Sequence, residues 1–341
     1  MNNLTQRFKV TLLIMTVLIC NPSKIRGEEG VSAYDFLNIP SSSFVMGSGG
    51  VNISSLHSDI NLADQNPSLI GPENNMQLNV GYMLYFGVSN FAGARFAMAT
   101  GEHGAWGAGV RYLNYGSFQG YDPEGFETGD FSVQDIIVEA TYSHDITYSL
   151  RGGINVKFVY SGYEKYTALA LAADLGLSYY DEFHDFSLGF VLKNMGGQIK
   201  RFEDKYDRLP FDIQIGITKG LSEQFSFSIT ADNLVRWKIP YYYHTNNEEG
   251  VMKSGGFLKN FFRHIVLGIE YDPIRSLYLT MGYNYKTMTD MDSYRRSLLS
   301  GFSIGAGFNI KAWSIGASYA LPQRGASTLM VNLGIDINEF L

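Results

Sequence analysis

Apolar and polar residues alternate with a period of two along most of the chain. Near the C-terminus, Val331, Leu333 and Ile335 alternate with Asn332 and Gly334. A period of two places successive side chains on opposite faces of a β-strand, so one face meets an apolar medium and the other does not. The pattern predicts strands, and it leaves open whether a protein core or lipid covers the apolar face.

From residue 75 onward we predict fourteen such segments, most of them about the length that a tilted strand needs to cross a bilayer. The segments run approximately over residues 75–85, 89–98, 103–116, 131–142, 147–160, 166–180, 184–196, 211–219, 223–236, 262–272, 276–286, 300–310, 311–321 and 326–338.

The long connections between these segments all fall at odd-numbered places, although three odd-numbered connections are short. Every even-numbered connection is short, and the four long ones, all odd-numbered, cover residues 116–131, 196–210, 238–262 and 287–301. Outer-membrane barrels have an even number of strands, short periplasmic turns and longer external loops, whereas a soluble sandwich has no reason to place every long loop at one end. We therefore expect an all-β fold: a transmembrane antiparallel outer-membrane barrel of about 14 strands, with both chain termini on the periplasmic side.

In such a barrel the last strand has to pair with the first, because an open edge in lipid leaves backbone groups without hydrogen bonds. The rows opposite the apolar rows then line the lumen. These rows carry both signs of charge, and the simplest expectation is that the charges pair with one another, whereas a selective pore would favour one sign. The expected lumen charges are Arg95, Arg111, Asp135, Glu139, Arg151, Lys157, Asp174, Lys193, Asp212, Asp232, Glu270, Lys286 and Asp336.

Residues 1–27 indicate a signal peptide. Arg7 and Lys9 precede Val10–Cys20, an apolar run that is too short to span a bilayer as a helix. Cys20 is the only cysteine and leaves with the signal, so no disulfide is expected in the remaining chain.

Residues 28–74 are too apolar for a free tail, and we expect them to form a plug, either inside the barrel or across its periplasmic mouth. A short helix is expected near Ala33–Leu37 and a turn at Gly47–Gly50. Residues 75–341 then form the barrel itself.

Composition and motifs exclude several classes of function. The net charge of −7 and the absence of long basic runs argue against a nucleic-acid partner. The six histidines fall mostly in expected turns or loops, and none belongs to a His-x-x-His or Glu-x-x-His pair that offers a metal site. No G-x-S-x-G nucleophile elbow is present. We expect no catalytic residues, no metal and no cofactor.

The long connections are rich in aromatic residues. Such residues either form the aromatic girdle at the membrane interface or anchor a partner protein, because Tyr and Phe are enriched at both places. The candidate partner-binding residues are Tyr241, Tyr242, Tyr243, Phe257, Phe261, Tyr294 and Tyr206, which follows Lys205.

Several short motifs resemble one family of outer-membrane barrels. The runs Phe36–Pro40, Met46–Gly50 and Ala63–Leu69 are similar to the PorV/PorQ barrels of the type IX secretion system. Tyr112–Phe118 and Leu209–Gln214 are most similar to the PorQ subgroup, while Ser41, Ser42 and Ser43 depart from the family pattern.

The resemblance implies a fourteen-stranded barrel similar to long-chain fatty-acid transporters. It also implies a role in the attachment complex, where a sortase-like protease joins secreted cargo to lipopolysaccharide. The expected partners are a PorZ-like surface protein, the sortase, a PorV-like barrel and outer-membrane lipid. The family has no catalytic residues to carry over.

Three hypotheses follow from the sequence. The first is an outer-membrane anchor that docks a surface component of the attachment complex through its external loops. The alternative is a transporter for hydrophobic small molecules, or a PorV-like cargo shuttle, although the charged lumen row argues against a continuous apolar cavity. The third is an outer-membrane enzyme, which would need a nucleophile and a base within reach of each other.

Overall fold

The computed structural model describes residues 32–340 except 56, 123, 203–205, 240, 246–247, 254–255, 291–298 and 324–325. The predicted signal peptide, residues 1–27, and the candidate Tyr294 lie outside the described residues, as does Lys205.

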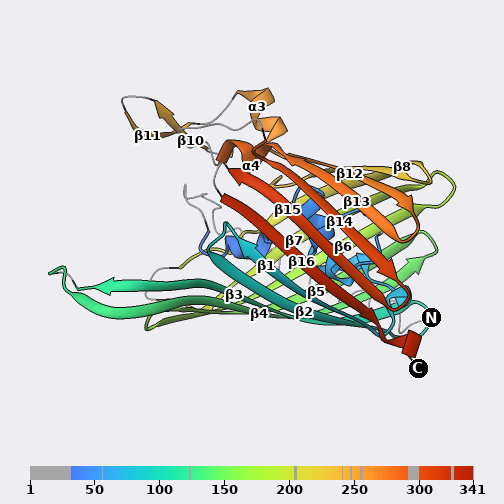
Figure 1. The fold of residues 1–341 in the computed structure, drawn as a ribbon, viewed down its shortest axis with the longest axis horizontal. Helices are drawn as coiled ribbons and strands as arrows, with labels where there is room; N and C mark the ends of the chain where they lie inside the picture. The colour runs from blue at the N-terminus through green and yellow to red at the C-terminus, as the bar shows by residue number, and fades with distance from the viewer. Residues whose placement is uncertain are drawn as a thin grey trace, which may run out of the picture. The chain divides into compact units, whose positions relative to one another are not determined.

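Fourteen antiparallel strands close into a barrel (Figure 1), which confirms the predicted fold class. The last strand, β16, pairs with the first, β1, from Gln77 opposite Asp336 to Leu84 opposite Leu329. The barrel strands are β1 (Gln77–Tyr85), β2 (Ser89–Ala99), β3 (Gly104–Tyr121), β4 (Glu127–Thr147), β5 (Leu150–Tyr163), β6 (Tyr166–Asp181), β7 (Phe186–Lys200), β8 (Asp212–Ser222), β9 (Phe225–Ala231), β12 (Ile265–Ile274), β13 (Leu277–Asn284), β14 (Phe302–Ile310), β15 (Trp313–Gln323) and β16 (Ala326–Asp336).

The apolar row of each strand points away from the lumen. In β16, Leu329 and Val331 are exposed on the outside of the barrel, while Met330 and Asn332, which alternate with them, are buried inside. The same alternation in β1 exposes Val80. An outward apolar belt around a polar interior is the pattern of a barrel that crosses a membrane, so lipid is the apolar medium that the alternation requires.

Three strands end earlier than the sequence pattern predicted. β16 stops at Asp336, where its ladder with β1 ends at Gln77, and continues as a short 3₁₀ helix, η5 (Ile337–Phe340). β9 stops at Ala231, where its partner β12 begins at Ile265. β13 stops at Asn284 and is followed by a helix, α4 (Tyr285–Asp290).

Regular structure extends into the predicted long loops. Residues 116–131 mostly extend β3 and β4 as a two-stranded ribbon that reaches beyond the other strands (Figure 1), with Tyr121 opposite Glu127 near its tip. The connection between β9 and β12 holds a separate hairpin, β10 (Tyr241–Thr245) and β11 (Glu248–Lys253), and the helix α3 (Phe257–Phe262). None of the described helices is long and apolar enough to cross a membrane.

The described residues of the segment 32–76 lie inside the barrel and form a plug of short helices. Their chemistry explains why they turn so often: Ser42 accepts a hydrogen bond from Val45 N at 3.2 Å at one helix start, and Asn66 accepts one from Ser68 N at 3.1 Å at another. The plug helices are η1 (Asp35–Asn38), α2 (Ser43–Gly47), η2 (Ile60–Asp64), η3 (Pro67–Leu69) and η4 (Pro72–Asn74).

The plug runs through the lumen from one end of the barrel to the other. Ser32 Oγ donates to the carbonyl oxygen of Arg208, which lies in a long connection. Asn75 Nδ2 instead donates to Asn338 Oδ1 at the end with the short connections. The first residue of β1, Gln77, and the last residue of β16, Asp336, lie at the short-connection end, as expected. Ser32, the first described residue of the plug, lies at the opposite end.

Candidate functional site

The plug fits the lumen because the inward rows of the wall carry glycines where its backbone passes. A Cβ atom added to Gly153 would lie 2.4 Å from the carbonyl carbon of Pro67, and one added to Gly176 would lie 2.0 Å from Asn66 Oδ1. Both approaches are far closer than any real Cβ contact allows. The plug and these glycines together define the interior, which we treat as the candidate site.

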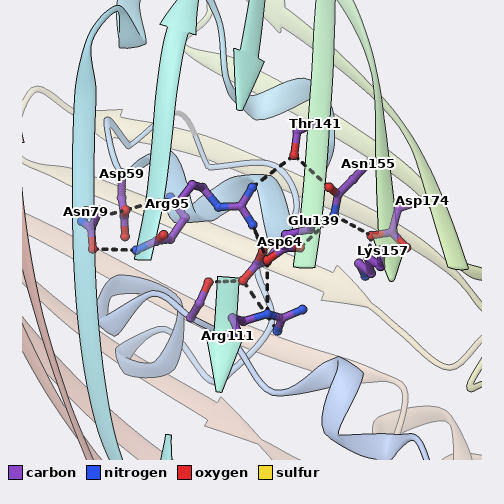
Figure 2. A network of polar contacts seen from close by, with 12 residues as sticks. Asp59, Asp64, Asn79, Arg95, Arg111, Glu139, Thr141, Asn155, Lys157 and Asp174 are labelled. Carbon is purple, nitrogen blue, oxygen red and sulfur yellow. Dashed lines mark hydrogen bonds and ion pairs between the residues drawn. The ribbon is translucent and has the colours of Figure 1, made fainter. Parts of the chain in front are cut away.

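A network of buried charges joins the plug to the wall, and Asp64 at the end of η2 is its centre (Figure 2). Asp64 pairs with Arg95 of β2 and accepts a hydrogen bond from Ser41 within the plug. Asp64 Oδ2, the oxygen that does not pair with Arg95, lies 3.7 Å from Arg111 Nη1 on β3. Glu139 of β4 pairs with the same two arginines, at 2.8 Å from Arg95 and 3.2 Å from Arg111.

The network continues around the wall through neutral side chains (Figure 2). Arg95 donates to Thr141 at 3.1 Å, Thr141 donates to Asn155 at 2.8 Å, and Asn155 donates to Glu139 at 3.1 Å. On the next strands, Lys157 pairs with Asp174 at 2.6 Å. The mixed lumen charges therefore pair with one another across neighbouring strands at these positions, and the plug supplies one carboxylate that the strand pattern did not include.

These ion pairs are almost completely withdrawn from solvent. The side chains of Arg95 and Asp64 are 2% and 3% exposed. Asp64 lies in the plug and not in a spanning strand; burial alone would raise its pKa, but Arg111 and Arg95 together hold the pKa well below its usual range. A buried charge network adds little stability over an apolar core, but removing one member leaves an uncompensated charge, so it fixes the plug in one position.

A second set of contacts holds the plug at the strand where the barrel closes. Asn332 of β16 accepts a hydrogen bond from Ser43 N at 2.6 Å and donates to the carbonyl oxygen of Ser41 at 3.0 Å. Asn79 of β1 accepts from Asn61 at 2.8 Å. At the short-connection end, Arg151 pairs with Glu73 at 2.6 Å, and this pair is much more exposed than the Asp64 network.

An apolar cluster lies in the lumen on the side of the long connections. Tyr34, Phe36 and Leu37 from the plug pack there against Met83 and Leu113 from the wall. The cluster also contains Met46, Phe91, Ile137, Val159, Ala170, Ala172, Leu209 and Met330. We call this group the upper apolar cluster, because it lies toward the long connections. The sequence pattern drew attention to the charged members of the lumen rows and did not identify this cluster.

A cavity of about 40 Å³ lies between the upper apolar cluster and the ion network. Its lining includes Phe36, Met83 and Leu113, and also the charged Arg95 and Arg111. The inward row of the wall is reduced to glycine here, because Gly81 of β1 lies opposite Gly93 of β2. For this reason the lining also reaches the outward-facing Tyr82 and Val110.

The predicted partner-binding residues do not gather at this interior site. Phe257 and Phe261 lie on α3 and are exposed, at 70% and 41%. Tyr206 is exposed in the connection between β7 and β8, with Arg201 stacked over its ring at 5.2 Å. The three tyrosines Tyr241, Tyr242 and Tyr243 form strand β10. The candidates that the structure describes therefore come from two different long connections, and Tyr294 belongs to a third.

Among the described residues, no group of three or more His, Cys, Asp or Glu side chains is arranged to hold a metal ion. His264 is buried, and its two ring nitrogens face the carbonyl oxygens of Asp232, at 2.8 Å, and Trp237, at 3.0 Å.

Comparison with known proteins identifies the fold. No protein-family model and no curated protein matches the chain. Among solved structures, the toluene transporter TodX of Pseudomonas putida aligns with a TM-score of 0.52 and 15% identity, covering 86% of this chain and 96% of TodX. The monoaromatic hydrocarbon channel CymD aligns with a TM-score of 0.52 and 10% identity, covering 89% of this chain and 97% of CymD.

A FadL homologue of Pseudomonas aeruginosa is also similar, at 9% identity and a TM-score of 0.49. At these identities the likeness extends to the fold. The chain is a membrane-spanning β-barrel of the outer-membrane type, with fourteen strands and a plugged lumen.

Proposed function

We propose that this protein is an outer-membrane passage for small hydrophobic molecules, closed by its plug. The observation that carries the proposal is the cavity under the upper apolar cluster, which contacts the plug, the wall and the outward face near the Gly81–Gly93 pair. The named activities of the structural neighbours, transport of toluene and of monoaromatic hydrocarbons, support the same substrate class.

The cavity is too small for such a molecule as it stands. An engineered cavity that binds benzene has a volume of about 150 Å³, whereas this one has about 40 Å³. Passage therefore requires the plug to move away from the wall, and the Asp64 network and the Asn332 contacts oppose that movement.

Uptake by intact cells tests the proposal. A host with a lipopolysaccharide outer membrane, expressing the barrel, is expected to take up a radiolabelled monoaromatic compound several times faster than the same host without it. Met83→Trp fills the cavity from the wall and is expected to abolish the gain. Met281→Trp is the matched control, because Met281 points outward and is 46% exposed. Equal uptake with and without the barrel would refute the proposal.

A second proposed function rests on a separate observation, the exposed apolar face of α3. Phe257, Leu258 and Phe262 are 70%, 68% and 51% exposed beside the long connections. Such a surface suits the docking of a partner protein. It is the feature that favours a PorQ-like anchor in the attachment complex, with a PorZ-like surface protein as the partner.

The anchor proposal is tested by co-purification from detergent-solubilised outer membranes, with an affinity tag in the short turn near Lys219. Replacing Phe257 and Leu258 with Ser is expected to reduce recovery of the surface protein at least about tenfold, as loss of interface anchors does. Phe183→Ser provides the control, since Phe183 is 99% exposed at the short-connection end. Recovery that is unchanged in the α3 variant would exclude α3 as the docking surface.

A further inference from the structure

Three buried oxygen atoms on β8 and just after β9 accept no hydrogen bond from any described residue. They are Asp212 Oδ1, Gln214 Oε1 and Asp232 Oδ1. The three side chains are 7%, 4% and 6% exposed. They face the lumen near the long-connection end, on strands that do not carry Asp64's arginine partners.

Strand geometry places these three side chains next to one another. Asp212 and Gln214 are two residues apart in β8 and so share one face of the strand. Ile215 pairs with Ala231 on β9, so the register places Gln214 opposite Asp232. The backbone confirms the proximity, because Asn233 N donates to Asp212 Oδ2 at 2.8 Å.

The orientation of Gln214 is fixed by its own hydrogen bond. Its amide nitrogen donates to Asp212 Oδ2 at 3.0 Å, so its amide oxygen is the atom that remains available. The site therefore presents two carboxylate oxygens and one amide oxygen, all of them acceptors.

Two neighbouring cations are engaged elsewhere. Lys286, which acts electrostatically on Asp232, pairs with Asp290 at 2.8 Å, and Arg263 pairs with Asp290 as well. His264 Nδ1 lies 2.8 Å from the carbonyl oxygen of Asp232, not from its carboxylate. Lys193 is opposite Asp212 in the β7–β8 register, yet no ion pair joins them in the described structure.

We propose that Asp212, Gln214 and Asp232 form a binding site for a hard divalent cation, with Ca²⁺ the best match. Buried carboxylates need a compensating charge. A single water molecule donates only two hydrogen bonds, whereas a cation satisfies three acceptors and neutralises two negative charges together. Ca²⁺ takes carboxylate and amide oxygens in irregular geometry and completes its shell with water.

A bound cation would fix the base of the connection that carries β10, β11 and α3. Asn233 already contacts Asp212, and the carbonyl oxygens of Asp232 and Trp237 both meet His264. The site is independent of the proposed passage, because it lies on other strands and uses none of the residues that line the cavity.

Calcium titration of the complete barrel in detergent, after removal of metals with a chelator, tests the site. Isothermal titration is expected to show one Ca²⁺ bound per chain. Asp212→Asn and Asp232→Asn each remove one charge while keeping the side-chain shape, and both are expected to weaken Ca²⁺ binding at least about tenfold. Asp181→Asn, at the short-connection end, is the matched control and is expected to bind as the unchanged protein does.

Terbium luminescence locates the ion without those variants. Trp237 stacks on His264 with the ring centroids 4.9 Å apart, so it is positioned to sensitise Tb³⁺ in the site. Trp237→Phe is expected to remove tryptophan-excited Tb³⁺ emission while leaving Ca²⁺ binding intact. If the unchanged barrel binds no Ca²⁺, if both Asn variants bind it normally, or if emission survives in Trp237→Phe, the proposal is overturned.

Discussion

At the scale of single residues, one carboxylate determines how the plug is held. Asp64 meets two arginines from two strands, and Glu139 meets the same two arginines from a third. Charges buried this deeply are costly to leave unpaired. Glu73 makes a comparable pair with Arg151, but the Glu73 side chain is 57% exposed, and solvent screens such a pair.

Asp64→Asn is therefore expected to destabilise the plugged barrel by about 3–5 kcal/mol, the usual cost of breaking a buried pair. Unfolding of the barrel by urea in lipid vesicles, read from heat-modifiable migration, measures the change. Glu73→Gln removes a plug carboxylate that also pairs with a wall arginine, and it is expected to lower the stability by at most about 1 kcal/mol. Equal losses of stability in the two variants would show that burial of the Asp64 network does not strengthen the hold on the plug.

At the scale of elements, the plug and the wall are matched through glycine. Gly152 and Gly153 are neighbours in β5 but point in opposite directions. A Cβ atom at Gly153 would lie 2.4 Å from the backbone of Pro67 in the plug, whereas one at Gly152 would meet only the flexible ends of Ile146 and Leu177, at 3.2 and 3.5 Å.

Gly153→Val is expected to displace η3 of the plug, while Gly152→Val is expected to leave it in place. Hydrogen exchange followed by mass spectrometry on peptides covering residues 60–70 provides the measurement. Exchange should be at least about tenfold faster in Gly153→Val, because the plug backbone loses its protected position. Unchanged exchange in that variant would mean that the plug adapts to the added side chain.

The sequence was most informative about individual strands. A period of two is a local signal, so all fourteen strands and their inward and outward faces were predictable. Strand ends were not, because they depend on the length of the partner: β9 stops where β12 begins. The ribbon at residues 116–131 was read as a loop because its glycines and acidic residues are rare in strands.

The interior was less predictable, because its contacts join residues far apart in the chain. Asp64 and Arg95 come from different segments, and Asp212 and Asp232 meet only through the β8–β9 register. A search for ligand pairs a few residues apart finds neither arrangement. The polar run Ala63–Leu69 did suggest a family resemblance, but nothing in it indicated that Asp64 would pair with arginines of the wall.

At the scale of the whole barrel, a closed wall surrounds a plug that packs against it through an apolar cluster and a network of buried charges. The proposed passage requires this plug to move before a hydrophobic molecule can pass, because the cavity under the upper apolar cluster has a volume of about 40 Å³. The movement of the plug is therefore the central claim.

A reversible tether between plug and wall tests that claim most directly. Ser54 Oγ and Thr218 Oγ1 are 2.8 Å apart, so cysteines at these two positions are placed to form a disulfide. The measurement is uptake of a monoaromatic compound by cells carrying the double variant, before and after reduction. We predict little uptake in the oxidised state and recovery after reduction, with the single variant Ser54→Cys unaffected throughout. Uptake at the same rate in the oxidised and reduced states would contradict the account.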